Sequence, residues 1–163
     1  MKISKKILLI LMVSAALISC SQKKLISIPI TYTQPYCGGA RPSEEILAEA
    51  AKPKPYSNKT IIIVSQKGKV DSLKTDATGV LKTNLKVGTY KLFEPWRYYK
   101  KADAGMKVSD FDLTCLKTEW MKEIKELTIT KTETKILDKN EIIERCPWSL
   151  PCILEGSKPP ARE

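Results

Sequence analysis

The 163-residue chain contains no histidine. Histidine is the usual general base and a common metal ligand, so sites of the Ser-His, Cys-His and histidine–zinc types are excluded. No G-x-x-x-x-G-K-[ST] or G-x-G-x-x-G pattern occurs, which leaves phosphate-cradling loops without support. There is no C-x-x-C pair either, so zinc and thioredoxin-like redox sites are not expected. These absences predict a protein that is not an enzyme and that needs neither a cofactor nor a metal.

No apolar run is long enough to cross a membrane as a helix. The longest follows Lys2, Lys5 and Lys6 and extends from Ile7 to Ile18, whereas a spanning helix needs about 20 residues. A basic start before a short apolar run is typical of a signal peptide. Residues 1–19 are therefore predicted to be a signal peptide, helical and later removed.

The four residues Leu17-Ile18-Ser19-Cys20 resemble the lipobox of bacterial lipoproteins. The resemblance implies cleavage before Cys20, a diacylglyceryl thioether on its sulfur and a fatty acid such as palmitate on its amine. Several acyl chains, at about 0.8 kcal/mol per buried CH₂, hold a protein firmly at a membrane. The implied location is the cell envelope, periplasmic or at the cell surface, with the outer membrane favoured. The alternative is an ordinary cleaved signal with an incidental cysteine.

The composition of the full chain is that of one globular domain, with 42% hydrophobic and 28% charged residues. The formal charge of +10 becomes +7 when the three lysines of the signal peptide are subtracted. This charge favours acidic partners, such as phosphorylated headgroups or acidic glycans, and an exported chain is not expected to meet nucleic acid. The alternative is a lysine-rich surface that only keeps the protein soluble.

We divide the mature chain into a tether at 20–24, a β-domain at 25–154 and a flexible tail at 155–163. Residues from Leu25 to Thr33 alternate between apolar and polar, which predicts a half-buried strand. Pro29 cannot donate a hydrogen bond, so this strand is expected at an edge, or with that position unpaired.

The stretch from Thr75 to Leu92 holds the clearest β pattern. Asp76 and Gly79 fit the ends of a type I turn, and the alternating strand Val80–Leu85 follows. With Tyr90 placed after the next glycine turn, the stretch resembles the carboxypeptidase regulatory-like domain. That resemblance implies a transthyretin-like (prealbumin-like) antiparallel β-sandwich and a non-catalytic accessory role. The alternative is any antiparallel meander with good turns.

Further elements are predicted around this stretch. The β-branched run in Thr60–Ser65 and the return at Val70–Thr75 predict, with the two strands that follow, four consecutive strands of one antiparallel sheet. Ser43 is expected to cap a short helix that stops near Ala51 before two prolines. A second helical insertion is expected at Ser109–Glu123. Late strands are predicted at 126–136, and 140–145 is either a strand or one helical turn.

Four cysteines remain in the mature chain, an even number that predicts two disulfides in an exported protein. They are Cys37, Cys115, Cys146 and Cys152. Three pairings are possible, and sequence does not choose among them. Our preference is Cys37 with Cys115 and Cys146 with Cys152, because Pro147 to Pro151 forms a short stiff loop.

One segment interleaves aromatic and basic residues, a combination that stacks on sugar rings or binds anionic groups. Its members are Trp96, Arg97, Tyr98, Tyr99, Lys100 and Lys101. The alternative is that Trp96 and one tyrosine cap the sandwich while the lysines stay in water.

Paired carboxylates are the remaining route to catalysis. The candidates are Asp76, Asp110, Asp112 and Glu119, and each also has a structural explanation in a turn, a cap or a solvated helix face. The sequence therefore predicts a lipid-anchored structural or binding module that contacts an envelope protein or a glycan. The alternatives are a glycan- or anion-binding lipoprotein that uses the aromatic-basic segment, and a hydrolase.

Overall fold

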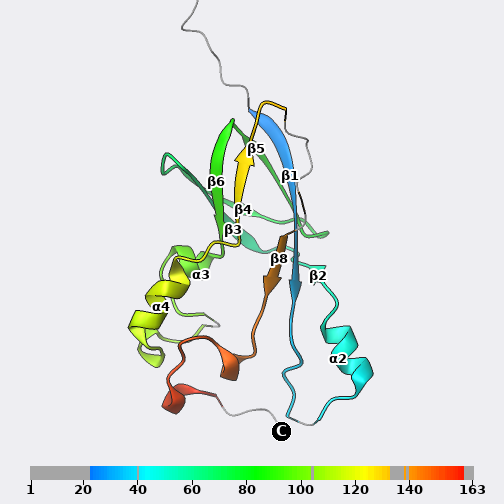
Figure 1. The fold of residues 1–163 in the computed structure, drawn as a ribbon, viewed down its shortest axis with the longest axis vertical. Coiled ribbons are helices and arrows are strands. Elements are labelled where there is room, and N and C mark those ends of the chain that lie inside the picture. The colour runs from blue at the N-terminus through cyan, green and yellow to red at the C-terminus, as the bar shows by residue number, and fades with distance from the viewer. Residues whose placement is uncertain (1–22, 40, 104, 133–137, 139, 160–163) are drawn as a thin grey trace, which may run out of the picture.

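The computed structural model describes residues 23–39, 41–103, 105–132, 138 and 140–159. Within them the chain forms a mainly β structure with two sheets of four strands each, as predicted (Figure 1). The predicted signal peptide, Cys20 and most of the tether, much of the late-strand segment and the end of the tail lie outside the described residues. The beginning of the predicted late segment is described, and it forms the strand Lys125–Ile129.

The first sheet is built on β1 (Lys24–Thr33), with β5 (Val80–Leu85) and β2 (Lys54–Pro55) antiparallel to it. On the other side, β8 (Asn140–Ile143) pairs with β1 in parallel, from Ile30 opposite Asn140 to Thr33 opposite Ile143. The expectation of a purely antiparallel body is therefore wrong at β8. The return of the chain from the second sheet brings β8 in beside β1 in the same direction.

The edge position expected for β1 is wrong for its second half, where β2 and β8 flank it, whereas from Lys24 to Pro29 the described residues pair β1 with β5 alone. The alternative expectation, an unpaired position for Pro29, agrees with the hydrogen bonds. The Ile30 amide donates to the carbonyl of Gly79, on the side of β5, at 2.9 Å. Backbone polar groups alternate sides along a strand, so the nitrogen of Pro29 faces the side on which β8 lies. The pairing with β8 begins only at the next residue, Ile30. A missing donor there breaks no ladder.

The second sheet is antiparallel, in the order β4-β3-β6-β7. Its strands are β4 (Val70–Lys74), β3 (Thr60–Ser65), β6 (Gly88–Phe93) and β7 (Lys125–Ile129). The prediction that four consecutive strands share one sheet is wrong, because β5 belongs to the first sheet. The predicted turn at Asp76–Gly79 is present, and it carries the chain from one sheet to the other.

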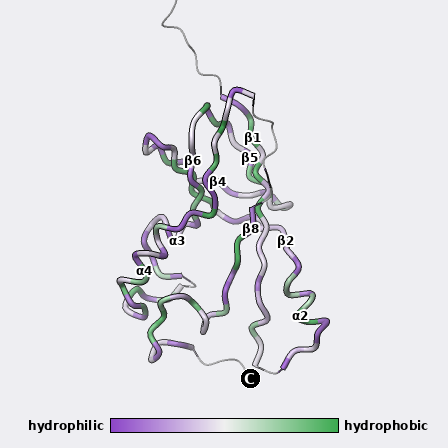
Figure 2. Tube along the Cα trace, in the orientation of Figure 1, coloured by the Kyte–Doolittle hydropathy of each residue, from purple (hydrophilic) through white to green (hydrophobic). Residues whose placement is uncertain are grey.

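The hydrophobic core lies between the two sheets. Isoleucine and leucine side chains from both sheets are fully buried there, among them Ile26, Ile28, Ile61, Leu81 and Leu92. Figure 2 shows hydrophilic colour at the tip of the β3–β4 hairpin, outside this core. A second, smaller core forms around Phe111, Leu116 and Leu150. It packs α3 (Pro95–Tyr98), α4 (Leu113–Trp120) and the C-terminal segment against one another.

The helical additions lie at the end of the sandwich opposite the start of β1 (Figure 1). The predicted helix after Ser43 is α2 (Glu44–Ala50), and the Ser43 hydroxyl accepts a hydrogen bond from the Ile46 amide at 3.4 Å. Pro95–Tyr98 forms the short helix α3. In the C-terminal segment, Pro147–Ser149 (η2) and Glu155–Ser157 (η3) are single 3-10 turns.

The predicted helix at Ser109–Glu123 is shorter than expected. A 3-10 turn, η1 (Val108–Asp110), comes first, and α4 (Leu113–Trp120) starts only after it. Between them, Phe111 is extended and forms a β-bridge with Ile153. Asp112 caps α4 by accepting from the Cys115 amide at 2.7 Å.

Two disulfides are present, as predicted, but the preferred pairing is wrong. Cys37 pairs with Cys146, and Cys115 pairs with Cys152. Cys37 follows β1 and Cys146 follows β8, so the parallel pairing of these strands brings both cysteines to the same end. The β-bridge beside Ile153 similarly brings Cys152 to the first turn of α4. Both placements depend on contacts between segments far apart in sequence.

Candidate functional site

A hollow of about 380 Å³ lies where the far end of the sandwich meets α3 and the segment after β8. We call it the Trp96 pocket. Its aromatic and charged lining residues are Tyr56, Lys59, Glu94, Trp96, Arg97, Asp103, Glu144 and Arg145. They come from four separate parts of the chain, and only two of them belong to the predicted aromatic-basic segment.

Local structure explains how these residues meet. Pro95 begins α3, where its fixed backbone suits the first helical position, and this leaves Glu94 just before the helix with Trp96 and Arg97 in its first turn. Glu144 continues the parallel ladder, since its amide donates to the carbonyl of Thr33 at 2.9 Å. The end of β1 therefore sets the position of one wall of the pocket.

Arg97 is held from three sides. Its Nε lies 3.1 Å from a carboxylate oxygen of Glu94, and its Nη1 lies 3.1 Å from a carboxylate oxygen of Glu119. Nη1 also donates to the backbone carbonyl of Glu119. The guanidinium carbon stacks 4.3 Å from the ring centroid of Trp96. Two carboxylates thus neutralise Arg97, which joins α3 to α4 and is not available as a free anion-binding cation.

The pocket perturbs two of its ionisable groups. Burial raises the pKa of the Glu94 carboxyl, and the hydrogen bond and charge of Arg97 offset part of that rise. Burial also raises the pKa of Tyr56, and the negative charges of Glu94, Glu144 and Asp103 raise it further. The Tyr56 hydroxyl therefore stays protonated at neutral pH and can donate a hydrogen bond.

The other members of the aromatic-basic segment do not line this pocket. The ring of Tyr98 lies 6.3 Å from that of Phe93, at the end of β6. Tyr99 is 53% exposed, and the ammonium of Lys101 lies 5.9 Å from its ring centroid. Lys100 is exposed, with a backbone φ of +53°. Of the six predicted residues, two therefore line the pocket, Tyr98 packs near Phe93, and the other three are on the exposed surface.

The four carboxylates considered for hydrolysis each have a structural role. Asp76 accepts from the Thr78 amide and hydroxyl and from the Val80 amide within its turn, and Asp110 accepts from the Lys107 amide in η1. Asp112 caps α4 and Glu119 pairs with Arg97 and with Lys122. None of the four lines the Trp96 pocket. The carboxylates that do converge, at the Trp96 pocket, are Glu94, Asp103 and Glu144.

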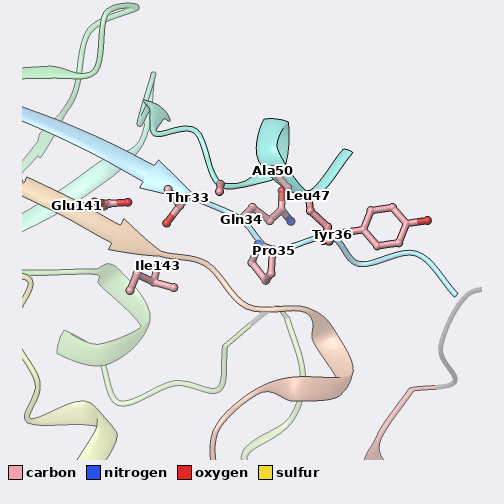
Figure 3. A pocket seen from close by; sticks show the side chains of 9 residues that line it. Thr33, Gln34, Pro35, Tyr36, Leu47, Ala50, Glu141 and Ile143 are labelled. Atoms are coloured by element: carbon pink, nitrogen blue, oxygen red, sulfur yellow. The ribbon is translucent and has the colours of Figure 1, made fainter. Parts of the chain in front are cut away.

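A second hollow, of about 450 Å³, lies between α2 and the exits of β1 and β8. Figure 3 shows Leu47 and Ala50 on α2 beside the segment around Pro35, with Ile143 on β8 across that segment. Leu47 is 49% exposed and Ile143 is 71% exposed, and α2 has no buried residue. The sequence patterns predicted β1 and α2. They did not predict this groove, because its walls are distant in sequence.

Comparisons of the chain with family models, with curated proteins and with solved structures found no match. The resemblance to the carboxypeptidase regulatory-like domain therefore stays a prediction. No helix among the described residues is long and apolar enough to cross a membrane. Within the same residues, no group of three histidine, cysteine, aspartate or glutamate side chains is arranged to hold a metal ion.

Proposed function

We propose that the chain is a lipid-anchored lipoprotein of the cell envelope that works as a non-catalytic binding module. The lipobox-like residues that end at Cys20 supply the anchor. The two disulfides support an exported protein, because thiols are oxidised outside the cytosol and mostly reduced within it.

The observation that carries this proposal is the direction of β1, which runs from the end nearest Cys20 to the end that holds the Trp96 pocket. β1 begins at Lys24, four residues after Cys20, and its 10 residues lead to the end that holds the Trp96 pocket. At about 3.3 Å per residue, the strand spans roughly 30 Å. A membrane anchor at Cys20 would therefore leave the pocket and the groove beside α2 facing away from the bilayer (Figure 1).

The anchor is tested by labelling cells with an alkyne analogue of palmitate and partitioning the extract in Triton X-114. We expect the wild-type chain to carry the label and enter the detergent phase. Cys20→Ala should lose both properties, because it has no sulfur to acylate. Ser21→Ala is the matched control and should behave as wild type. Unlabelled wild-type protein in the aqueous phase would refute the anchor.

A second candidate function is glycan binding at the Trp96 pocket. An indole and a phenol line one hollow together with carboxylates and cations, groups that stack on sugar rings and bond to sugar hydroxyls. Three carboxylates and three cations line it, with Arg97 already neutralised. This balance favours a neutral glycan over the acidic glycan that the net charge of the chain suggests.

Affinity electrophoresis separates these possibilities, with gels that contain either a soluble neutral glucan or acidic alginate. Trp96→Leu keeps an apolar side chain for the second core and should abolish retardation by the neutral glucan. Tyr99→Leu changes an exposed aromatic outside the pocket and should leave it unchanged. Retardation by alginate alone, lost on Tyr99→Leu, would instead favour the solvated part of the aromatic-basic segment.

A further inference from the structure

At the end of the sandwich where β1 begins, three separate segments enclose a hollow of about 380 Å³. One is the segment before β1, which contributes Lys23. The others are the β3–β4 turn, with Lys67 and Lys69, and the β5–β6 turn, with Lys86. We call this the lysine hollow. Figure 1 shows the start of β1 and the β5–β6 turn together at the end opposite α3 and α4.

The lysine hollow is strongly basic. Four lysines line it, and Asp71 is the one carboxylate among its described lining residues, which leaves a net formal charge of +3. Asp71 pairs with Lys69, whose Nζ lies 3.2 Å from a carboxylate oxygen. All four lysines are exposed. The Trp96 pocket at the other end instead balances its charges, so the two ends of the molecule differ in electrostatic character.

Hydrogen bonds fix the two turns that carry Lys67, Lys69 and Lys86. In the β3–β4 turn, the amides of Gly68 and Lys69 donate to the carbonyl and the hydroxyl of Ser65, at 2.8 and 2.9 Å. In the β5–β6 turn, the Tyr90 hydroxyl donates to the carbonyl of Lys86 at 2.9 Å. The Gln66 amide donates to the carbonyl of Thr89 in β6 at 3.0 Å, which places the start of the β3–β4 turn beside β6. The hollow is therefore organised before any ligand arrives.

We propose that the lysine hollow is the membrane-facing surface of the protein and binds the phosphate groups of anionic phospholipids. This inference rests on the proposed anchor at Cys20. Three residues of extended chain span at most about 10 Å, so Lys23 cannot lie farther than that from the acylated residue. The Debye length at physiological salt is about 8 Å, so the anchor holds the lysines where the headgroup charge acts on them.

The shape of this end fits a headgroup layer as well as its charge does. Val87, at the tip of the β5–β6 turn next to Lys86, is 48% exposed. Serine, threonine, asparagine and glutamine side chains fill the lining between the lysines and supply hydrogen-bond donors for phosphate oxygens. An apolar tip beside lysines is typical of surfaces that sit at the boundary between headgroups and acyl chains.

The test uses the full chain as its host processes it, reconstituted into nanodiscs of phosphatidylcholine alone or with a third of phosphatidylglycerol. Amide hydrogen exchange is then compared for peptides that cover residues 65–70 and 85–90. We expect exchange in both peptides to be slower on the anionic discs. The triple variant Lys67→Gln, Lys69→Gln, Lys86→Gln should lose this difference.

The matched control variant, at the other end, is Lys52→Gln, Lys54→Gln, Lys100→Gln, and it should keep the difference. Equal exchange on both kinds of disc, with the protein still bound to them, would overturn the lysine hollow and leave the anchor standing. Binding to anionic discs alone would refute the anchor but support the hollow. Co-elution with neither would refute both. If added inorganic phosphate slows amide exchange in the two peptides on neutral discs, the hollow binds free phosphate. The proposal that it binds lipid phosphate would then be overturned.

Discussion

Gly79 occupies the most constrained backbone position in the turn between β4 and β5. Its φ is +77°, a conformation that side-chain-bearing residues rarely adopt. A Cβ added there would lie 2.6 Å from the carbonyl oxygen of Ile30 and 2.9 Å from the amide nitrogen of Tyr56. Those two atoms form a hydrogen bond of 3.0 Å with each other. Gly79→Ala therefore strains the turn and also displaces the junction of β1 and β2.

Gly68 provides a matched control, because its φ is +79° but nothing lies within 4 Å of an added Cβ. Alanine in this conformation costs about 1–2 kcal/mol, and restriction of the unfolded chain returns about 0.4–1 kcal/mol. We therefore expect Gly68→Ala to lower the free energy of unfolding by about 0 to 1.6 kcal/mol. The two variants share the conformational cost, so their difference measures the steric conflict at Gly79.

That steric conflict disrupts two hydrogen bonds, from Tyr56 to Ile30 and from Ile30 to Gly79. A buried polar group left without its partner costs about 1–3 kcal/mol. We therefore expect Gly79→Ala to lower the free energy of unfolding by at least about 2 kcal/mol more than Gly68→Ala. Urea unfolding, followed by far-UV circular dichroism, measures both values.

Asparagine at the same two positions separates conformation from contact, because asparagine tolerates positive φ better than alanine but keeps a Cβ. Gly68→Asn should be nearly neutral, whereas Gly79→Asn should remain strongly destabilising. If the Gly79 and Gly68 variants unfold within about 0.5 kcal/mol of each other, the close approach of Gly79 to Ile30 does not exist. The proposed crossing between the sheets would then be wrong.

Three further predictions concern stability. Replacing Cys37 and Cys146 together with alanine should lower the free energy of unfolding by about 3–5 kcal/mol in urea titrations, because their separation of 109 residues closes a long loop; a loss below about 1 kcal/mol would argue against this pairing. Hydrogen bonds within its own turn lower the pKa of Asp76 from 3.8 to about 2, so its stabilising contribution is present above about pH 4 and is lost as the pH falls toward 2. Asp76→Asn should remove this part of the acid sensitivity, measured by unfolding at a series of pH values. An unchanged pH profile would contradict this prediction. Leu116→Ala should lower the free energy of unfolding by about 2–5 kcal/mol in chemical denaturation, because the side chain is buried. Leu47 is half exposed, so Leu47→Ala should lower it by less than about 0.5 kcal/mol. Similar losses for the two variants would be inconsistent with the open groove beside α2.

Local patterns predicted the elements well. The alternation from Leu25 to Thr33 became β1, and Ser43 caps α2 as expected. The turn from Asp76 to Gly79 has the predicted hydrogen bond and positive φ. Each of these features depends on residues within a few positions of one another, so the sequence carries the information directly.

Pairing between distant segments was predicted poorly. The sequence does not indicate that β5 pairs with β1 rather than with β6, or that β8 joins β1 in parallel. The same difficulty explains the wrong disulfide pairs, since strand pairing decides which cysteines meet. It also explains why Tyr56 and Glu144 were not expected beside Trp96.

By itself, the sequence indicated a start that resembles a lipobox, half-buried strands, the helices that became α2 and α4, and two disulfides. Those properties follow from the order of neighbouring residues. Only the tertiary structure decided that one end of the sandwich gathers Lys23, Lys67 and Lys86 while the other encloses Trp96 with balanced charges. Side chains distant in sequence become neighbours when the sheets pack, because burial of the shared core fixes which turns lie together.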